Sequence, residues 1–307
     1  MTPADSHNGR GGRRQLLKSG FAAVMLLFAG RAQAAPLRPP TPPPPAQTPA
    51  PPPGPPRPGD PPDKQTTSGI TIQPTDPAIT AGAVEYPGVT GPLLGYLAAP
   101  KGADVYPGVL VLHDSAGLTE HFKDIVRRLA KAGFVALALD LASRAGGTEK
   151  LGDPAKVNAA LQLLGAGQFL QDLNRSVRYL EAAPLVAKTR IGALGFGVGG
   201  NLLWLVLTGN ADVKAAVSVS GTIPSDRVVS NLQAAVLSIY GETDRRDEEA
   251  ITDFDTAMKK AGLAFTLKVE PKAGHNFFND TTPAYVPAAA KDAWGMTLDW
   301  FAQHLKG

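Results

Sequence analysis

The sequence RIGALGFGVGGNLLWLVL, residues 190–207, decides the fold of this chain. Its first part, Arg190 to Leu194, has the apolar character of a buried strand, and Val198 to Leu207 is predicted to form a helix. A glycine-rich turn, GFGVGG, joins the two parts. A buried strand that enters a helix through a short turn is the repeating unit of proteins with parallel sheets. The stretch therefore predicts an α/β fold.

Strands and helices alternate on both sides of this stretch. The first two predicted strands flank a Gly/Pro turn and are expected to form an antiparallel hairpin. The later strands alternate with helices, which implies a mostly parallel central sheet with helices on both faces. The predicted strands are 84–86, 93–98, 108–112, 134–139, 190–194, 214–219, 234–240 and 263–269, and the predicted helices are 121–132, 168–181, 198–207, 248–261 and 287–305.

The first 34 residues have the features of a targeting segment. Arg13 and Arg14 precede a short apolar run, residues 21–29, and a small-x-small sequence follows at Ala32 to Ala34. We expect a twin-arginine-type signal peptide, removed before Ala35, and a periplasmic or secreted mature protein. A single membrane anchor is the alternative, which the short apolar run disfavours. No stable membrane insertion is expected after cleavage.

Residues 35–64 are dominated by proline, which favours extended chain and cannot bury an apolar face. They are predicted to be a disordered spacer, and composition alone leaves open a role as ligand for a proline-binding partner. The domain is expected to span residues 65–307, which suits one α/β domain with a single core.

The composition excludes several classes of protein. Residues 1–34 hold five of the 30 Lys and Arg residues and one of the 27 acids, so the remainder carries 25 basic and 26 acidic residues. No basic surface for nucleic acid is expected from this balance. The chain has no cysteine, which excludes disulfides, thiolate metal sites and a cysteine nucleophile.

Polar and glycine-rich segments follow five of the predicted strands, where parallel sheets carry their functional sites. A glycine-rich turn, then an aspartate, then a histidine is the chain order of an α/β-hydrolase catalytic triad. We therefore expect Asp244 and His275 to form a hydrogen-bonded pair, although each alone could be a helix cap or a surface loop residue. The five segments are 113–117, 140–144, 195–200, 241–244 and 273–280.

The strings HDSAGL, LDLASRAGGT, GALGFGVGG, SIYGETD and AGHNFFNDTTPAYVPAAAKDAW resemble the dienelactone hydrolase family over residues 85–305. The resemblance implies an α/β-hydrolase fold and action on ester or lactone carbonyls. It implies a cysteine nucleophile in a Gly-x-Cys-x-Gly turn, with an aspartate at Asp244 and a histidine at His275. The nucleophile position is Gly197, so this sequence departs from the family there.

Four further residues take roles that the resemblance implies. Asp114 falls where the family has a glutamate that contacts the nucleophile, one methylene longer than the side chain present here. The backbone N–H groups of Ser115 and Val198 match the oxyanion hole. Arg144 matches an arginine that binds the substrate carboxylate, and a solvated loop charge is its alternative interpretation.

Other candidates are weaker. Gly195-x-Gly-x-x-Gly200 also satisfies a dinucleotide-binding pattern, but the next predicted strand ends Ser218-Val219-Ser220 without the acid that binds ribose. No cofactor and no metal is therefore expected. Three serines near strand ends could in principle replace the nucleophile, but none of them lies on a sharp strand-to-helix turn: Ser115, Ser218 and Ser220. His113 is expected to be a packed strand-end residue, and His121 and His304 to lie on helix surfaces.

Two interpretations follow from glycine at the nucleophile position. In the first, His275, oriented by Asp244, activates a water that occupies the space of the missing side chain, and the protein hydrolyses an ester or lactone. In the second, the site binds a small carboxylated ligand without catalysis, as a periplasmic binding protein. The sequence leaves both open.

Overall fold

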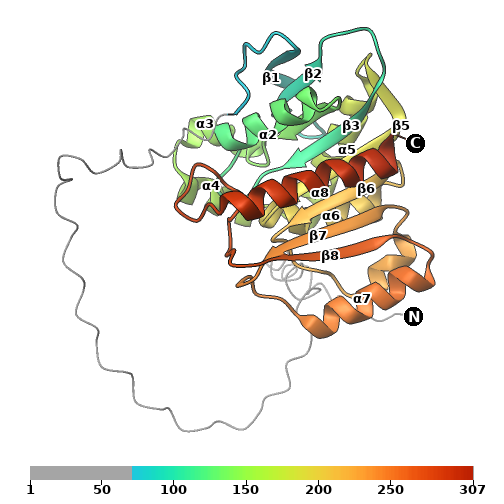
Figure 1. Ribbon diagram of the computed structural model, residues 1–307. Coiled ribbons are helices and arrows are strands. Elements are labelled where there is room, and N and C mark those ends of the chain that lie inside the picture. The colour runs from blue at the N-terminus through green and yellow to red at the C-terminus, as the bar shows by residue number, and fades with distance from the viewer. Residues whose placement is uncertain (1–70, 307) are drawn as a thin grey trace, which may run out of the picture.

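The computed structural model of this chain describes residues 71–306 (Figure 1). The predicted signal peptide at 1–34, the predicted spacer at 35–64 and the first six residues of the predicted domain lie outside the described residues, so these remain predictions. No helix within residues 71–306 is long and apolar enough to cross a membrane.

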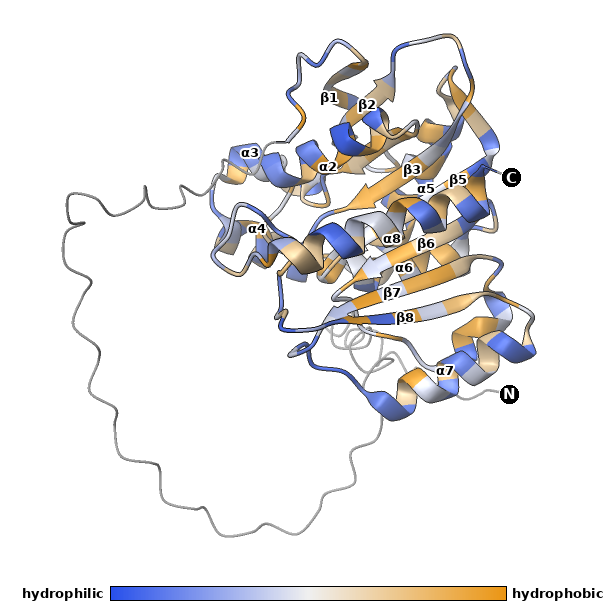
Figure 2. Ribbon diagram, in the orientation of Figure 1, coloured by the Kyte–Doolittle hydropathy of each residue, from blue (hydrophilic) through white to orange (hydrophobic). Residues whose placement is uncertain are grey.

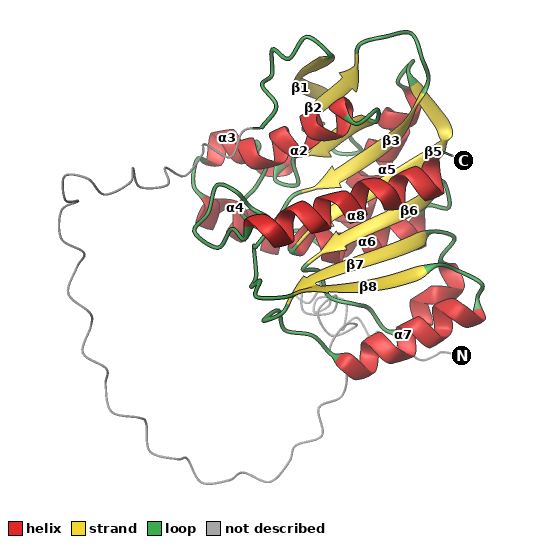
Figure 3. Cartoon of the chain, viewed as in Figure 1, coloured by secondary structure: helices red, strands yellow, loops and turns green. Residues whose placement is uncertain are grey.

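One eight-stranded sheet forms the centre of the domain, with the strand order β1-β2-β4-β3-β5-β6-β7-β8 (Figure 3). The first two strands form the expected antiparallel hairpin, and β2 pairs with β4 antiparallel. All other neighbours are parallel, which confirms the predicted fold class. The strands are β1 Ile79–Pro87, β2 Pro92–Pro100, β3 Tyr106–Leu112, β4 Val135–Leu139, β5 Val186–Phe196, β6 Val213–Val219, β7 Ala235–Gly241 and β8 Phe265–Glu270.

Helices cover both faces of the sheet, because alternate residues of the buried strands point to opposite sides. On β3, Leu110 and Leu112 belong to the part of the core that includes residues of α5, α6 and α7, whereas Val109 and Val111 belong to the part that includes residues of α2 and α8. Figure 2 shows the apolar central strands between these layers. The helices are α2 Glu120–Lys131, α3 Thr148–Leu151, α4 Pro154–Gln162, α5 Ala166–Ala182, α6 Val198–Gly209, α7 Glu248–Lys260 and α8 Pro287–Leu305.

The segment between β4 and α5 is more helical than its sequence pattern predicts. It contains a 3-10 turn at Ser143–Ala145 and the helices α3 and α4, which were not predicted. The start of α4 has a local signal that could have revealed it: Asp153 caps the helix by accepting a hydrogen bond from the Ala155 N–H, and Pro154 occupies the first turn.

The segment that precedes β1 is fastened to α2. Asp124, fully buried, accepts hydrogen bonds from the N–H groups of Thr71 and Ile72 at 3.0 and 2.8 Å. Arg127 Nε donates to the Ile72 carbonyl at 2.6 Å, and further along the helix Lys131 pairs with Asp76. The described chain therefore begins as a strap along one face of this helix.

Candidate active site

The turn between β5 and α6 is a sharp elbow centred on Gly197, which has φ 51° and ψ −113°. This backbone conformation strains any residue with a side chain. A Cβ at Gly195 would collide with the backbone of Gly199, so that glycine is required by close packing. A Cβ at Gly197 would instead find its nearest neighbour, Asp114 Cβ, at 3.7 Å. The elbow therefore has room for a side chain at Gly197, the position that the family resemblance assigns to the nucleophile.

Asp244 and His275, which follow β7 and β8, meet at the same edge of the sheet. His275 Nδ1 lies 2.8 Å from Asp244 Oδ1, and Oδ2 of the same carboxylate accepts from Ser220 Oγ at 2.6 Å and from the Gly241 N–H at 2.8 Å. Burial by itself raises the pKa of Asp244, but these hydrogen bonds outweigh it and hold the pKa below its ordinary value. The aspartate is thus an ionised acceptor at neutral pH.

His275 is the exposed member of this pair, with 58% of its side chain accessible. The hydrogen bond with Asp244 raises the pKa of His275; burial opposes this, and the charges of Asp244 and Asp114 add to it. Because the ionised carboxylate accepts from Nδ1–H, the opposite nitrogen, Nε2, is the one available to take a proton. This is the tautomer that a general base requires.

Asp114, at the end of β3, stands where the resemblance places the glutamate. Its Oδ1 accepts from the Ala116 N–H at 2.8 Å, which holds the carboxylate close to its own loop. Within residues 71–306, neither the Ser115 N–H nor the Val198 N–H donates to another protein group. Both amides of the expected oxyanion hole are therefore available to a ligand oxygen.

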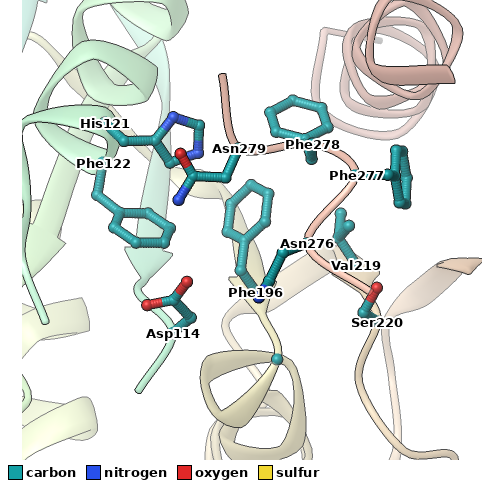
Figure 4. Close-up of a pocket in the computed structure, with 11 residues that line it drawn as sticks. Asp114, His121, Phe122, Phe196, Val219, Ser220, Asn276, Phe277, Phe278 and Asn279 are labelled. Atoms are coloured by element: carbon teal, nitrogen blue, oxygen red, sulfur yellow. The ribbon is translucent and has the colours of Figure 1, made fainter. Parts of the chain in front are cut away.

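A small pocket of about 20 Å³, enough for about one water molecule and partly open to solvent, lies at the elbow (Figure 4). Asp114, Gly197 and Ser220 line one part of it, and Phe122 and Phe278 contribute aromatic surface. Two non-glycine residues with left-handed backbone also lie on its wall, Ser220 with φ 54° and Asn276 with φ 65°. Strained residues gather at functional sites more often than elsewhere, so this clustering favours a site here.

Arg144 does not line this pocket, and its expected role in binding a substrate carboxylate stays a prediction. Its Nε and Nη2 donate to the two oxygens of Asp172 on α5, each at 2.8 Å. This bidentate pairing occupies the edge with which arginine recognises carboxylates. The structure thus uses Arg144 to fasten the loop after β4 to α5.

The burial of His113 was predicted correctly from the sequence, and that of His121 was not. His113 is buried as expected, with Nδ1 donating to the Asp114 carbonyl and Nε2 accepting from the Leu141 N–H. The prediction for His121 was wrong. It is only 1% exposed, lies on the wall of the pocket and pairs with Asp280.

The serine alternatives do not form a second nucleophile site. Ser220 Oγ donates its hydrogen bond to Asp244, and within residues 71–306 it makes no hydrogen bond with a histidine. Ser218 Oγ is buried without a hydrogen-bond partner in the described part of the chain. Across residues 71–306, no group of three or more His, Cys, Asp or Glu residues could hold a metal ion.

Known proteins resemble this chain in sequence and in structure. A family model described as "Dienelactone hydrolase family" matches residues 93–305. A "Putative carboxymethylenebutenolidase" from Methylorubrum extorquens is 32% identical over 246 residues, 76% of this chain and 84% of that protein. A "Probable 2-oxo-3-(5-oxofuran-2-ylidene)propanoate lactonase" from Bradyrhizobium sp. is 32% identical over 227 residues, 70% of this chain and 90% of that protein. The crystal structure of a "Putative Dienelactone Hydrolase" from Klebsiella pneumoniae has a TM-score of 0.67 and 29% identity, covering 74% of this chain and 100% of that one.

Proposed function

The chain belongs to the dienelactone hydrolase family, and on that premise we propose that it hydrolyses ester or lactone bonds with water as the nucleophile. The observation that carries the proposal is the Asp244–His275 hydrogen bond of 2.8 Å beside an elbow with room at Gly197. The names of the curated relatives, a butenolidase and a lactonase, support lactones as a substrate class.

The reaction that this geometry supports is general-base catalysis. His275 Nε2 takes a proton from a water molecule at Gly197, and the water oxygen forms a bond to the carbonyl carbon. The N–H groups of Ser115 and Val198 stabilise the negative oxygen of the tetrahedral intermediate. The carbon–oxygen bond to the leaving group then breaks, and the proton on His275 neutralises the released alkoxide. Asp244 stabilises the imidazolium form of His275 from the removal of the water proton until that proton is transferred again.

Catalysis by this route should be slow. Loss of a triad nucleophile costs about a millionfold in kcat, and roughly 10³ to 10⁴ over water remains from the oxyanion hole and binding. The second candidate function, binding without catalysis, is favoured by one observation only, which is that Gly197 offers no nucleophilic atom. The pairing of Arg144 with Asp172 weakens the case for a carboxylate ligand at that arginine.

The test is hydrolysis of p-nitrophenyl acetate and of a dienelactone by the purified protein and by its His275→Ala variant. We expect the variant to lose about 10² to 10⁴ in kcat/KM, the usual contribution of a general base. Equal rates in the two proteins would contradict hydrolysis by this pair and leave ligand binding as the better account.

We also propose that residues 1–34 export the protein through a twin-arginine pathway, with cleavage before Ala35. The motif at Arg13 and Arg14 and the small residues at 32–34 support it. Replacing both arginines by lysine should leave the protein uncleaved in the cytoplasm. N-terminal sequencing of exported protein that still begins at Met1 would contradict the proposed cleavage.

A further inference from the structure

A second histidine–aspartate pair lies near the elbow, and its histidine, His121, lines the same pocket as Gly197. We propose that His121 is the acid that protonates the leaving group. This inference rests on the proposed hydrolysis and assigns a residue that the triad does not contain. Figure 4 shows His121 and Asn279 on the side of the pocket away from Asp114.

The second pair has the same arrangement of atoms as the first. His121 Nδ1 lies 2.8 Å from Asp280 Oδ1, as His275 Nδ1 does from Asp244. Burial alone raises the pKa of Asp280, but hydrogen bonds with His121 and Arg128 outweigh it and keep the pKa below its ordinary value. The ionised carboxylate therefore accepts from Nδ1–H. No group within residues 71–306 hydrogen bonds to His121 Nε2, which leaves that nitrogen to a ligand in the pocket.

Charged groups hold this histidine from behind. Arg128 Nη2 bridges Asp280 and Asp124 with contacts of 2.5 Å to each, and Asp124 in turn binds the strap at Thr71. Replacing such a buried charged network by apolar residues is often neutral or stabilising, so stability alone gives little reason to keep it. A fixed direction for the His121 ring gives a reason, because an acid must hold its proton within reach of the leaving oxygen.

One loop fixes both pairs relative to each other. His275 and Asp280 belong to the segment that follows β8, five positions apart, and this segment also supplies Asn276 and Phe278 to the pocket wall. The aromatic rings of Phe122 and Phe278 lie 5.0 and 6.2 Å from the His121 ring, which gives that end of the pocket an apolar surface. The proposed acid therefore lies in the pocket that Gly197 lines, and the proposed base is linked to the same pocket through Asp244 and Ser220.

In this refinement of the proposed reaction, His121 replaces His275 as the group that protonates the leaving oxygen, and the step balances without a further reactant. His275 removes a proton from water as the water oxygen bonds to the carbonyl carbon. When the ester carbon–oxygen bond breaks, the electron pair stays on the leaving oxygen. His121 in its imidazolium form, with Nδ1–H held by Asp280, transfers its Nε2 proton there and becomes neutral. His275 then releases its proton to solvent and His121 takes one up, so that ester and water become acid and alcohol. The acid matters most when the leaving oxygen is strongly basic.

This dependence on the leaving group separates catalysis from structural support. Phenyl acetate and p-nitrophenyl acetate share one acyl group, but phenoxide is the more basic leaving group. We expect His121→Gln to lower kcat/KM for phenyl acetate by about 10² while changing that for p-nitrophenyl acetate by no more than about threefold. His304→Gln, a histidine of α8 against Trp300 and outside the pocket, is the matched control and should change neither.

Asp280→Asn is the second variant, needed if His121→Gln does not fold, as circular dichroism and a melting curve would show. It should give a loss with the same preference for phenyl acetate. An equal loss for both esters, or no loss for either, would overturn the role of His121. The proposed function fails in a different way: the parent would then hydrolyse p-nitrophenyl acetate no faster than His275→Ala does.

Discussion

Placing a cysteine at the elbow, Gly197→Cys, should convert the protein into a conventional acyl-transferring hydrolase. The new Cβ would lie 3.7 Å from Asp114 Cβ, an ordinary contact, so no neighbour has to move. The cost is the backbone conformation at φ 51°, about 1 to 3 kcal/mol of folding stability for a residue with a side chain. A thiolate forms readily beside a histidine, and His275 already has its aspartate partner.

The gain follows from what the missing nucleophile costs. Because removal of a triad nucleophile lowers kcat about a millionfold, we expect Gly197→Cys to raise it by at least about 10² even with imperfect alignment. The Asp114→Glu change should be tested in the same background, since it restores the longer side chain that the family resemblance implies. Burst kinetics with p-nitrophenyl acetate and the intact mass of the acyl-enzyme measure the outcome.

Gly197→Ala is the control, because it carries the same backbone strain without a nucleophile. It should lose a similar amount of stability in urea unfolding and gain no activity. A folded Gly197→Cys, Asp114→Glu protein that forms no acyl adduct and turns over no faster than Gly197→Ala would refute the reasoning. Asp244 and His275 would then not act on the elbow, and ligand binding would become the leading function.

The remaining predictions concern pH, Arg144 and the domain boundary. Because the hydrogen bond with Asp244 raises the pKa of His275, the base is neutral only at higher pH. The value of kcat/KM should therefore rise with pH, through a midpoint above the ordinary histidine value of 6.5. Asp244→Asn should move that midpoint down, and an unmoved midpoint would contradict the pairing of Asp244 with the catalytic base. Arg144→Ala should lower the free energy of unfolding in urea by about 1 to 3 kcal/mol without changing the preference between neutral and acidic esters. Arg178→Ala, at an exposed arginine, should lower it by less than about 1 kcal/mol. If Arg144→Ala abolished a preference for acidic esters, Arg144 would be a substrate-binding residue. A chain that starts at Gln65 should melt within a few degrees of the mature protein, and a much lower melting temperature would show that the domain begins earlier.

The sequence allowed most of the sheet and the Asp244–His275 pair to be predicted, because both depend on order along the chain. Apolar runs mark buried strands, and the carboxyl ends of parallel strands meet at one edge whatever the loops do. The elbow could also be predicted, because its glycines are required by the structure. A Cβ at Gly195, Gly199 or Gly200 would collide with backbone atoms or with Ser218, and Gly197 has a left-handed φ.

The partners of His121 and Arg144 could not be predicted, for a different reason. His121 stands next to the inward-facing stripe of its helix, and the partner that buries it, Asp280, lies 159 positions further along the chain. Arg144 lies 28 positions from Asp172, on a different element. Helical periodicity reports only on neighbours three or four positions away, so no local pattern could show that either side chain had a partner. Such pairings belong to the tertiary structure.

The strap at the start of the described chain also has a mechanical consequence. Thr71 and Ile72 are bound to Asp124 and Arg127, and Asp76 to Lys131, all before the chain reaches the edge strand β1. A pulling force applied to the chain before Thr71 would act first on these hydrogen bonds and ion pairs, which would transmit the force to α2. The hydrogen bonds that join β1 to β2 would be loaded only after the strap had peeled from the helix. A tether attached at this end thus pulls on the helix that carries His121 before it pulls on the sheet.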